Sequence, residues 1–167
     1  QMAVEEKVEL RKGLKDVYFD KTESSFIDGT AGKLLYRGYN IHDLAEHSSF
    51  EETCYLLLLG SLPTRAQLDE FDGRLKEGRA IPDEIVEIIR LTRDSHPMDV
   101  LRTAVSALVG RDRTSEDSTP EANVSRGVRI TGAMATIVAT HDRIRRGKAH
   151  IAPDQKAGTG HCAHLVD

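Results

Sequence analysis

The sequence of 167 residues contains no tryptophan, only two cysteines and no long hydrophobic run. Its longest apolar stretch, 55–59, is far shorter than the roughly 20 residues that a helix needs to cross a bilayer. Cys54 lies in this apolar part of the chain and Cys162 in a polar stretch, so a disulfide framework is not expected. The composition therefore favours a protein of the reducing cytoplasm, with no membrane partner.

The chain also lacks a strong excess of charge of one sign. Its formal net charge is -4 and its pI about 6.0, which gives no electrostatic reason to expect nucleic-acid binding. With 39% apolar and 30% charged residues, the composition is that of a folded chain. The length fits one domain.

Several catalytic and targeting motifs are absent as well. The sequence contains no glycine-rich phosphate loop, no His-Glu-x-x-His and no Gly-x-Ser-x-Gly. The charged segment 1–12 lacks the apolar centre of a signal peptide. Gln1 is not a natural start, so we expect a processed or engineered front end, with residues 1–11 forming a flexible terminus.

A small β element is predicted between residues 16 and 37. Short β-prone runs occur at 17–19, 26–27 and 34–36, and Asp28-Gly29 and Gly32 supply turns between them. The pattern is typical of a hairpin or meander. Such an element is marginal alone, so it should rest on helices.

From residue 40 onward the pattern predicts helices, which makes the fold mainly α. Asn40 can cap a short helix that runs to Ala45. Ser49–Glu52 reads as a capping box for a helix that ends at Gly60, and Thr64–Gln67 repeats the capping pattern. Leu68, Phe71 and Leu75 form a narrow apolar face on the helix that follows. Pro82 suits the first turn of the next helix, whose expected buried face consists of Ile85, Ile88 and Ile89.

Two later helices are more apolar, and they span 97–109 and 121–146. Pro97 opens the first one. Its apolar positions are Met98, Leu101, Val105 and Leu108. Those of the second are Val124, Val128, Met134, Ile137, Val138 and Ile144. Small residues on the second would let another helix approach closely: Gly132, Ala133, Ala135 and Ala139.

Two clusters could carry chemistry near the end of the sequence. His161-Cys162-Ala163-His164 holds three metal-capable side chains, but no fourth ligand has the spacing of a zinc site, so a tail without a metal is favoured. The basic run Arg143–Lys148 could bind phosphate. Compensation of the helix macrodipole explains the same residues without a ligand, and it is the favoured interpretation.

Three further features have a structural and a functional interpretation. The segment Tyr36–Tyr39 could place Arg37 beside aromatic rings in a ligand pocket, or it could be a turn with Gly38 at positive φ. His96 before a helix is more often a hydrogen-bonding residue than a catalyst. Cys54 is more often a small buried apolar residue than a nucleophile. From the residues alone, no convincing catalytic set emerges.

An ordered series of motifs nevertheless resembles the amino-terminal part of the citrate synthase family, which includes the 2-methylcitrate synthases. The resemblance covers about residues 12–154. The segments that carry it are Lys12–Leu14, Phe26–Gly29, Leu35–Tyr39, Leu44–Glu52, Tyr55–Leu57, Gly60–Thr64 and His96–Leu108. After Asp154 the sequence departs from the family, so residues 155–167 are expected to form an atypical, disordered tail.

The resemblance implies an enzyme that condenses acetyl-CoA and oxaloacetate, with water, to citrate and free coenzyme A. Members of the family use an Asp, two His and several arginines, with no metal and no further cofactor. None of these catalytic residues can be placed in this chain. The seven histidines (His42, His47, His96, His141, His150, His161 and His164) lack the family's catalytic context, and Asp154 is followed by Gln155.

The expected molecule is therefore a truncated, inactive member of the family that still associates. The resemblance implies a homodimer or a larger association through the helices at 97–109 and 121–146. The candidate interface residues are Met98, Leu101, Val105, Leu108, Val128, Gly132, Ala135 and Val138. The alternatives are a non-catalytic interaction module, which pairs with a full-length member, and a fragment of a 2-methylcitrate synthase.

Overall fold

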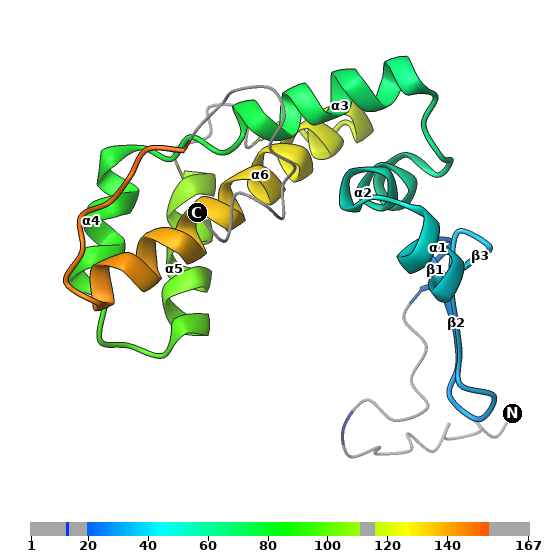
Figure 1. The fold of residues 1–167 in the computed structure, drawn as a ribbon, viewed down its shortest axis with the longest axis horizontal. Helices are drawn as coiled ribbons and strands as arrows, with labels where there is room; N and C mark the ends of the chain where they lie inside the picture. Colours follow the sequence, from blue (N-terminus) through cyan, green and yellow to red (C-terminus); the bar gives the residue numbers. More distant parts are fainter. Residues whose placement is uncertain (1–12, 14–19, 111–115, 154–167) are drawn as a thin grey trace, which may run out of the picture.

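The computed structural model describes residue 13, residues 20–110 and residues 116–153, and within these ranges it contains a three-stranded sheet followed by six helices (Figure 1). The predicted class, mainly α with a small β element, is confirmed. The predicted β-prone run at 17–19 lies outside the described residues. None of the described helices combines the length and the apolar character that a membrane crossing requires.

The sheet is an antiparallel meander in the order β1-β2-β3. Its strands are β1 (Ser25–Asp28), β2 (Lys33–Tyr36) and β3 (Tyr39–Asn40). Ser25 pairs with Tyr36 and Asp28 with Lys33. The Asp28 carboxylate accepts hydrogen bonds from the amides of Thr30 and Ala31, both at 3.0 Å, and thereby holds the first turn. The predicted turn at Asp28-Gly29 is confirmed.

The first two helices begin at the predicted caps. In α1 (Ile41–His47), the Asn40 side chain accepts a hydrogen bond from the amide of His42. In α2 (Phe50–Leu59), Ser49 and Glu52 form the complete reciprocal capping box, and Gly60 ends the helix at φ 90°. The amino-terminal end of each helix is therefore fixed by side chains within three residues of it in sequence.

Four longer or more buried helices follow in the described part of the chain. They are α3 (Arg65–Glu77), α4 (Asp83–Leu91), α5 (Pro97–Gly110) and α6 (Pro120–Arg145). Thr64 and Gln67 form a second capping box, and Thr119 caps α6. The prediction for Pro82 is shifted by one position, because it occupies the cap before α4 instead of its first turn.

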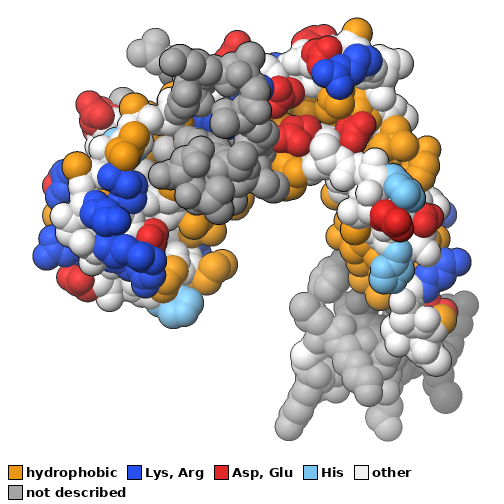
Figure 2. All heavy atoms as spheres, viewed as in Figure 1, with side chains coloured by type: hydrophobic (Ala, Val, Ile, Leu, Met, Phe, Trp, Pro, Cys, Tyr) orange, Lys and Arg blue, Asp and Glu red, His pale blue; other side chains and the backbone are white. Residues whose placement is uncertain are grey.

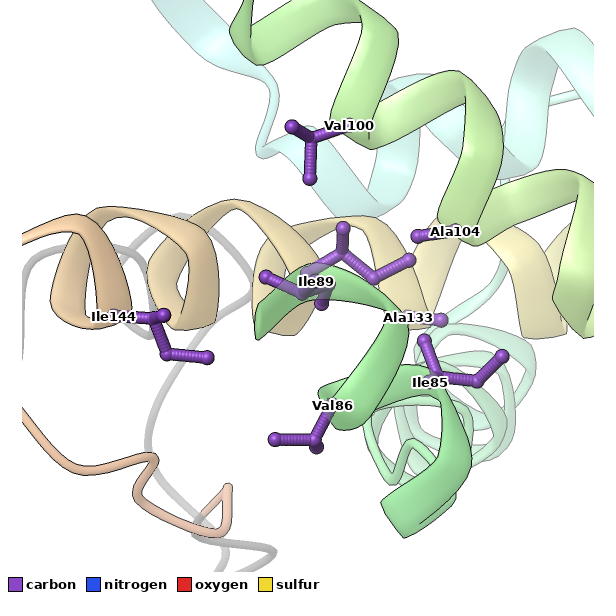
Figure 3. Close-up of a cluster of buried hydrophobic side chains, with 8 residues drawn as sticks. Ile85, Val86, Ile89, Val100, Ala104, Ala133 and Ile144 are labelled. Carbon is purple, nitrogen blue, oxygen red and sulfur yellow. The ribbon is translucent and has the colours of Figure 1, made fainter. Parts of the chain in front are cut away.

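The main core lies between α4, α5 and α6 (Figure 3). Ile85 and Ile89 of α4 are fully buried there, as predicted, whereas Ile88 is only partly buried. Val86 is buried in its place. The other buried members of this core are Val100, Ala104, Ala133, Ile137 and Ile144.

A second core joins α3 to the first half of α6. Phe71, Leu75 and Val128 are buried there, and the rings of Tyr55 and Phe71 meet edge-on with centroids 5.3 Å apart. The long helix α6 therefore contributes to both cores. Figure 1 shows it running beneath α3 at one end and between α4 and α5 at the other.

The sheet and α1 project from this helical body as an arm, which gives the described chain the outline of an arch (Figure 1). We use "arm" for residues 25–47 and "body" for residues 65–145, as far as they are described. Leu44 is the one buried apolar residue of the arm. Phe26 and Ile27 of β1 are 57% and 72% exposed. We expected the sheet to rest on helices. In the structure it rests mainly on α1, which packs against β2 and β3.

Candidate functional site

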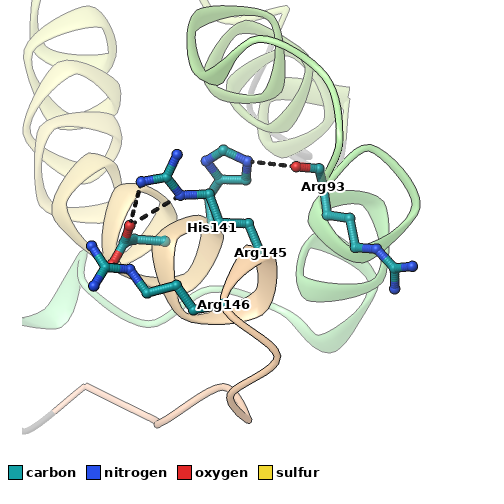
Figure 4. A network of polar contacts seen from close by, with 5 residues as sticks. Arg93, His141, Arg145 and Arg146 are labelled. Carbon is teal, nitrogen blue, oxygen red and sulfur yellow. Dashed lines mark hydrogen bonds and ion pairs between the residues drawn. The ribbon is translucent and has the colours of Figure 1, made fainter.

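The basic end of α6 is partly neutralised by its own helix. Arg145 donates two hydrogen bonds to Asp142 Oδ1, at 3.1 and 2.9 Å, and Arg146 Nε lies 2.9 Å from Asp142 Oδ2 (Figure 4). The hydrogen bonds from Arg145, together with Arg146, hold the pKa of the Asp142 carboxyl below its usual value. Two of the arginines that were considered for phosphate binding therefore already have an acidic partner.

The rest of the basic run turns back against the helix end. Arg143 Nε donates to the carbonyl of Ala149 at 2.8 Å, and the amide of Lys148 donates to the carbonyl of Arg143 at 2.9 Å. Gly147 adopts φ 72°, the left-handed conformation common just after helices. Figure 2 shows Lys and Arg side chains gathered over this end of the molecule. Helix termination accounts for these contacts without a phosphate ligand.

The Tyr36–Tyr39 segment is a two-residue hairpin turn. Arg37 and Gly38 have φ values of 48° and 91°, and Tyr36 pairs with Tyr39. Positive φ at both central residues is the geometry that a tight hairpin needs to match the twist of its strands. Of the two interpretations, the structure supports the turn with Gly38 at positive φ, and Arg37 adopts a positive φ that carries a steric cost for any residue except glycine.

The Arg37 side chain reaches from this turn to the end of α2. One terminal nitrogen lies 3.5 Å from the carbonyl oxygen of Leu57, and the other lies 3.7 Å from a carboxylate oxygen of Glu23. A cation at the carboxyl end of α2 also complements the helix macrodipole. Arg37 thus ties the arm to α2. It does not line the nearby pocket of about 280 Å³, whose lining includes Tyr36, Leu44 and Phe50.

His96 and Cys54 both have structural surroundings. The ring nitrogen Nδ1 of His96 accepts a hydrogen bond from the amide of Met98 at 3.2 Å, so this histidine caps α5. Cys54 packs against the second core, where burial and the charge of Glu51 raise its pKa. A thiol that resists ionisation is a poor nucleophile. The structural interpretation of both residues is supported.

The cluster His161, Cys162 and His164, for which a tail without a metal is the favoured interpretation, lies outside the described residues. Within residues 20–110 and 116–153, no three His, Cys, Asp or Glu side chains gather in a way that could hold a metal ion.

An apolar pocket of about 240 Å³ opens where the α3–α4 connection meets α5 and α6. Its lining residues are Gly78, Ala80, Pro82, Leu108, Val109, Arg129, Ile130 and Ala133. This lining contains one charged side chain and no carboxylate, imidazole, thiol or hydroxyl. It offers neither a nucleophile nor a general base.

The eight candidate interface residues fall into three groups. Met98 and Val138 are exposed, at 63% and 47%. Leu101, Val105 and Leu108 pack partly against the main core. Val128, Gly132 and Ala135 are buried within the chain itself.

Gly132 shows why these small residues are needed inside the chain. A Cβ atom at this position would lie 2.4 Å from the carbonyl oxygen of Leu75 and 3.0 Å from the Cα of Gly78. The end of α3 therefore approaches the backbone of α6 closely. The prediction that small residues admit another helix holds, but for Gly132 the approaching helix belongs to the same chain.

Several buried polar residues were not predicted. Arg79, Thr136, Thr140 and His141 are all at most 7% exposed. His141 Nε2 lies 3.2 Å from the carbonyl oxygen of Arg93 and so connects α6 to the segment after α4 (Figure 4). The spacing of His141 from Ile137 and Ile144 places it on the buried face, so its burial could have been predicted. Nothing in the sequence around Arg79 indicates that it is buried.

Comparison with known proteins identifies the class. The family model described as "Citrate synthase, C-terminal domain" matches residues 13–167. The citrate synthase of Haloferax volcanii is 41% identical over 163 residues, which cover 95% of this chain and 42% of that protein. The 2-methylcitrate synthase of Mycobacterium tuberculosis (strain H37Rv) is 38% identical, over 93% of this chain and 39% of that protein.

Comparison of the fold identifies the same class of protein. The crystal structure of citrate synthase from Pyrobaculum aerophilum matches 91% of this chain with a TM-score of 0.84 and 35% sequence identity. The match covers 40% of that structure. The chain belongs to the citrate synthase family, and it spans about 40% of the length of the relatives that it matches.

Proposed function

We propose that this chain supplies the amino-terminal scaffold of a citrate synthase and does not catalyse the condensation by itself. The observation that carries the proposal is the length of the match, about two fifths of each relative. The motif series starting at Lys12 supports the amino-terminal placement, although the matching model is described as a C-terminal domain. The proposed scaffold comprises residues 12–154, and the match to the family model continues to residue 167.

The reaction of the complete enzyme would join acetyl-CoA to oxaloacetate and release coenzyme A, with no metal and no further cofactor. Such chemistry requires an acid–base pair and charge stabilisation in a closed cleft. The described histidines include His96, which caps a helix, and His141, which bonds to a backbone carbonyl. The apolar pocket at Gly78 and Ile130 has no such groups. These features support an inactive scaffold.

A thiol-release assay tests the lack of activity. The purified chain is incubated with acetyl-CoA and oxaloacetate, and free coenzyme A is followed with a thiol reagent. A full-length citrate synthase serves as the positive control. We expect no substrate-dependent release above background, and turnover by the chain alone contradicts the proposal.

Association through α5 and α6 is the second part of the proposal. The exposed Met98, Met134 and Val138 leave an apolar surface on these helices that a second copy would cover. Light scattering after size-exclusion chromatography should give a dimer or a larger species for the native chain. The double substitution M98Q/V138T should shift it toward the monomer, whereas Ile27→Thr in the distant sheet should not. A monomeric native chain at high concentration contradicts this part.

The alternative candidate is a non-catalytic module that pairs with a full-length member of the family in the cytoplasm. The same exposed surface on α5 and α6 favours it. Mixing the tagged chain with a full-length citrate synthase and separating the species by size distinguishes the two. Mixed species favour the module, and only self-association favours the scaffold of a longer enzyme. The relatives include both citrate and 2-methylcitrate synthases.

A further inference from the structure

Two Asp-Gly steps occur in the sequence, Asp28-Gly29 and Asp72-Gly73, and Asn-Gly does not occur. In such a step the backbone nitrogen of the glycine can attack the side-chain carboxyl carbon of the aspartate, because glycine has no Cβ to hinder the approach. The arm holds one of these steps and the body holds the other. Their surroundings therefore decide which of the two can react.

The step in the arm lies at the turn between β1 and β2. Asp28 is the last residue of β1, and its Oδ1 accepts hydrogen bonds from the amides of Thr30 and Ala31, both at 3.0 Å. Since these amides follow Gly29 in the chain, the carboxyl group is folded back toward the Gly29 nitrogen. Gly29 is exposed, and a Cβ atom at this position would meet no atom beyond its chain neighbours within 4 Å. The carboxyl carbon and the attacking nitrogen therefore lie together in open space.

The step in the body lies inside α3. The amide of Gly73 belongs to the helix, where each amide donates to the carbonyl four residues earlier. Asp72 Oδ2 lies 2.5 Å from Lys76 Nζ, and the two side chains are only 29% and 13% exposed. The ion pair directs the carboxylate one turn along the helix rather than toward the Gly73 nitrogen. Ring closure here requires α3 to open, and α3 contributes Phe71 and Leu75 to the second core.

The arm opens more easily than α3 because few of its apolar residues are buried. Leu44 is the one buried apolar residue among residues 25–47. Figure 1 shows the β1–β2 turn at the tip of the arm, at the end away from α1 and the body. Segments with little buried apolar surface open at a lower free energy than a packed core. Both the geometry and the cost of opening therefore favour reaction at Asp28.

We propose that Asp28-Gly29 is a modification site, at which the chain converts aspartate to isoaspartate through a cyclic succinimide. The Gly29 nitrogen forms a bond to Cγ of Asp28, and the hydroxyl of the protonated carboxyl leaves with the amide proton as water. Water then adds to the ring. Cleavage at the former main-chain carbonyl gives isoaspartate, and cleavage at the other carbonyl restores aspartate.

The conversion needs no reactant besides water, because the water lost in the first step is regained in the second. Isoaspartate carries a free main-chain carboxylate, which is the group that S-adenosylmethionine-dependent carboxyl methyltransferases modify. An enzyme of this class is therefore the partner that the aged arm would recruit. The inference is independent of the proposed role in citrate synthesis.

Isoaspartate would change the turn in two ways. The main chain would run through the former side chain and become longer by one methylene group. The carboxyl carbon of Asp28 would become part of a backbone amide, so it would no longer offer a carboxylate to the amides of Thr30 and Ala31. The pairing of Asp28 with Lys33 would be displaced as well. The hairpin should therefore loosen while the body stays folded.

Peptide mapping after prolonged warm incubation of the full chain near neutral pH tests the site. Trypsin separates the two steps into peptides 22–33 and 66–74. An isoaspartyl peptide has an unchanged mass but a shifted elution time, and it accepts a methyl group from S-adenosylmethionine in the presence of the methyltransferase. Peptide 22–33 should accumulate at least about tenfold more isoaspartate than peptide 66–74. Equal amounts in the two peptides overturn the proposal.

The same incubation in concentrated urea shows whether the fold causes the difference. Unfolding frees the Gly73 amide and separates Asp72 from Lys76, so the two peptides should accumulate similar amounts. A difference in urea as large as that in the native chain would assign the effect to the neighbouring sequence and would overturn the role of the fold.

A matched pair of glycine substitutions tests the attacking nitrogen. Gly29→Ala and Gly73→Ala each place a methyl group where no atom beyond the chain neighbours lies within 4 Å, and neither position requires a positive φ. Gly29→Ala should remove most of the isoaspartate from peptide 22–33, because the methyl group hinders ring closure. Gly73→Ala should leave that peptide unchanged. Equal isoaspartate at Asp28 in the native chain and in Gly29→Ala overturns the assignment.

Hydrogen exchange of the isomerised chain, separated from the native chain by chromatography, tests the consequence for the arm. Exchange should quicken in β1 and β2 and stay unchanged in α3 and α6. Unchanged exchange in the two strands would show that the turn tolerates the longer backbone and would overturn the predicted loosening.

Discussion

The body and the arm contain similar proportions of apolar residues, but they bury different shares of them. In the body, twelve apolar residues from α3, α4, α5 and α6 are buried, whereas in the described arm only Leu44 is. The arm is held by strand pairing, by α1 and by the reach of Arg37 to α2. Regions with few buried apolar contacts open at a lower free energy than the core. The described chain therefore contains one region with many buried apolar residues and one region with few.

The two regions should differ most in the unfolding free energy that is lost when one isoleucine in each is replaced by alanine. Ile89→Ala leaves a cavity in the main core and should cost about 3–4 kcal/mol of unfolding free energy. Ile27→Ala, at a position 72% exposed, should cost less than about 0.5 kcal/mol. Urea denaturation followed by circular dichroism measures both. Similar losses for the two variants contradict the comparison.

A glycine pair in α6 tests the close approach of α3. Gly132→Ala places a Cβ against backbone atoms of Leu75 and Gly78 and should cost about 1–3 kcal/mol. Gly127→Ala is the control, because its Cβ meets only a Leu58 methyl group at 3.7 Å. It should stabilise the chain by up to about 1 kcal/mol through helix propensity. Thermal melts should show opposite shifts, and shifts of the same sign are inconsistent with the packing described.

Arg37→Ala should loosen the arm while the body stays folded. The lost contact to Leu57 is long, so we expect a loss of at most about 1 kcal/mol, confined to the arm. Hydrogen exchange should quicken in β2 and β3 and stay unchanged in α5. Arg37→Lys, which keeps the charge but loses the planar group, should have an intermediate effect. Faster exchange throughout the body is the result that contradicts a separate arm.

The smallest effect should be the contribution of His150, which lies just after α6, to the pH dependence of stability. His150 has a lowered pKa in the folded chain, so its contribution to stability is present above pH 6.5 and declines as the pH falls. Denaturation midpoints of the native chain and of His150→Asn should therefore diverge between pH 7.5 and pH 5.5. Parallel pH profiles show that His150 does not contribute.

The parts of this fold that were predictable depend on nearby residues. The caps at Asn40, Ser49 and Thr64 and the end at Gly60 were predicted because each is satisfied within three or four positions. The turn at Gly38 follows from the same local rules. The family followed from the order of motifs, which no single motif would have shown.

The parts that were not predictable depend on which segments meet in space. Val128, Gly132 and Ala135 suggested contact with a second chain, and the structure buries all three within this one. Met134 and Val138 fit the apolar pattern of α6 but lie exposed. Periodicity identifies an apolar helix, but it does not say which of its stripes a neighbouring helix will cover.

Hydrogen exchange across the native chain tests the contrast between the two regions most directly. We expect amides of α6 between 128 and 144 to be protected at least about 100-fold more than those of the strands in the arm, which corresponds to about 3 kcal/mol in opening free energy. Such a result supports a body that is stable on its own and an arm that depends on it. Equal protection in the two regions would contradict this account.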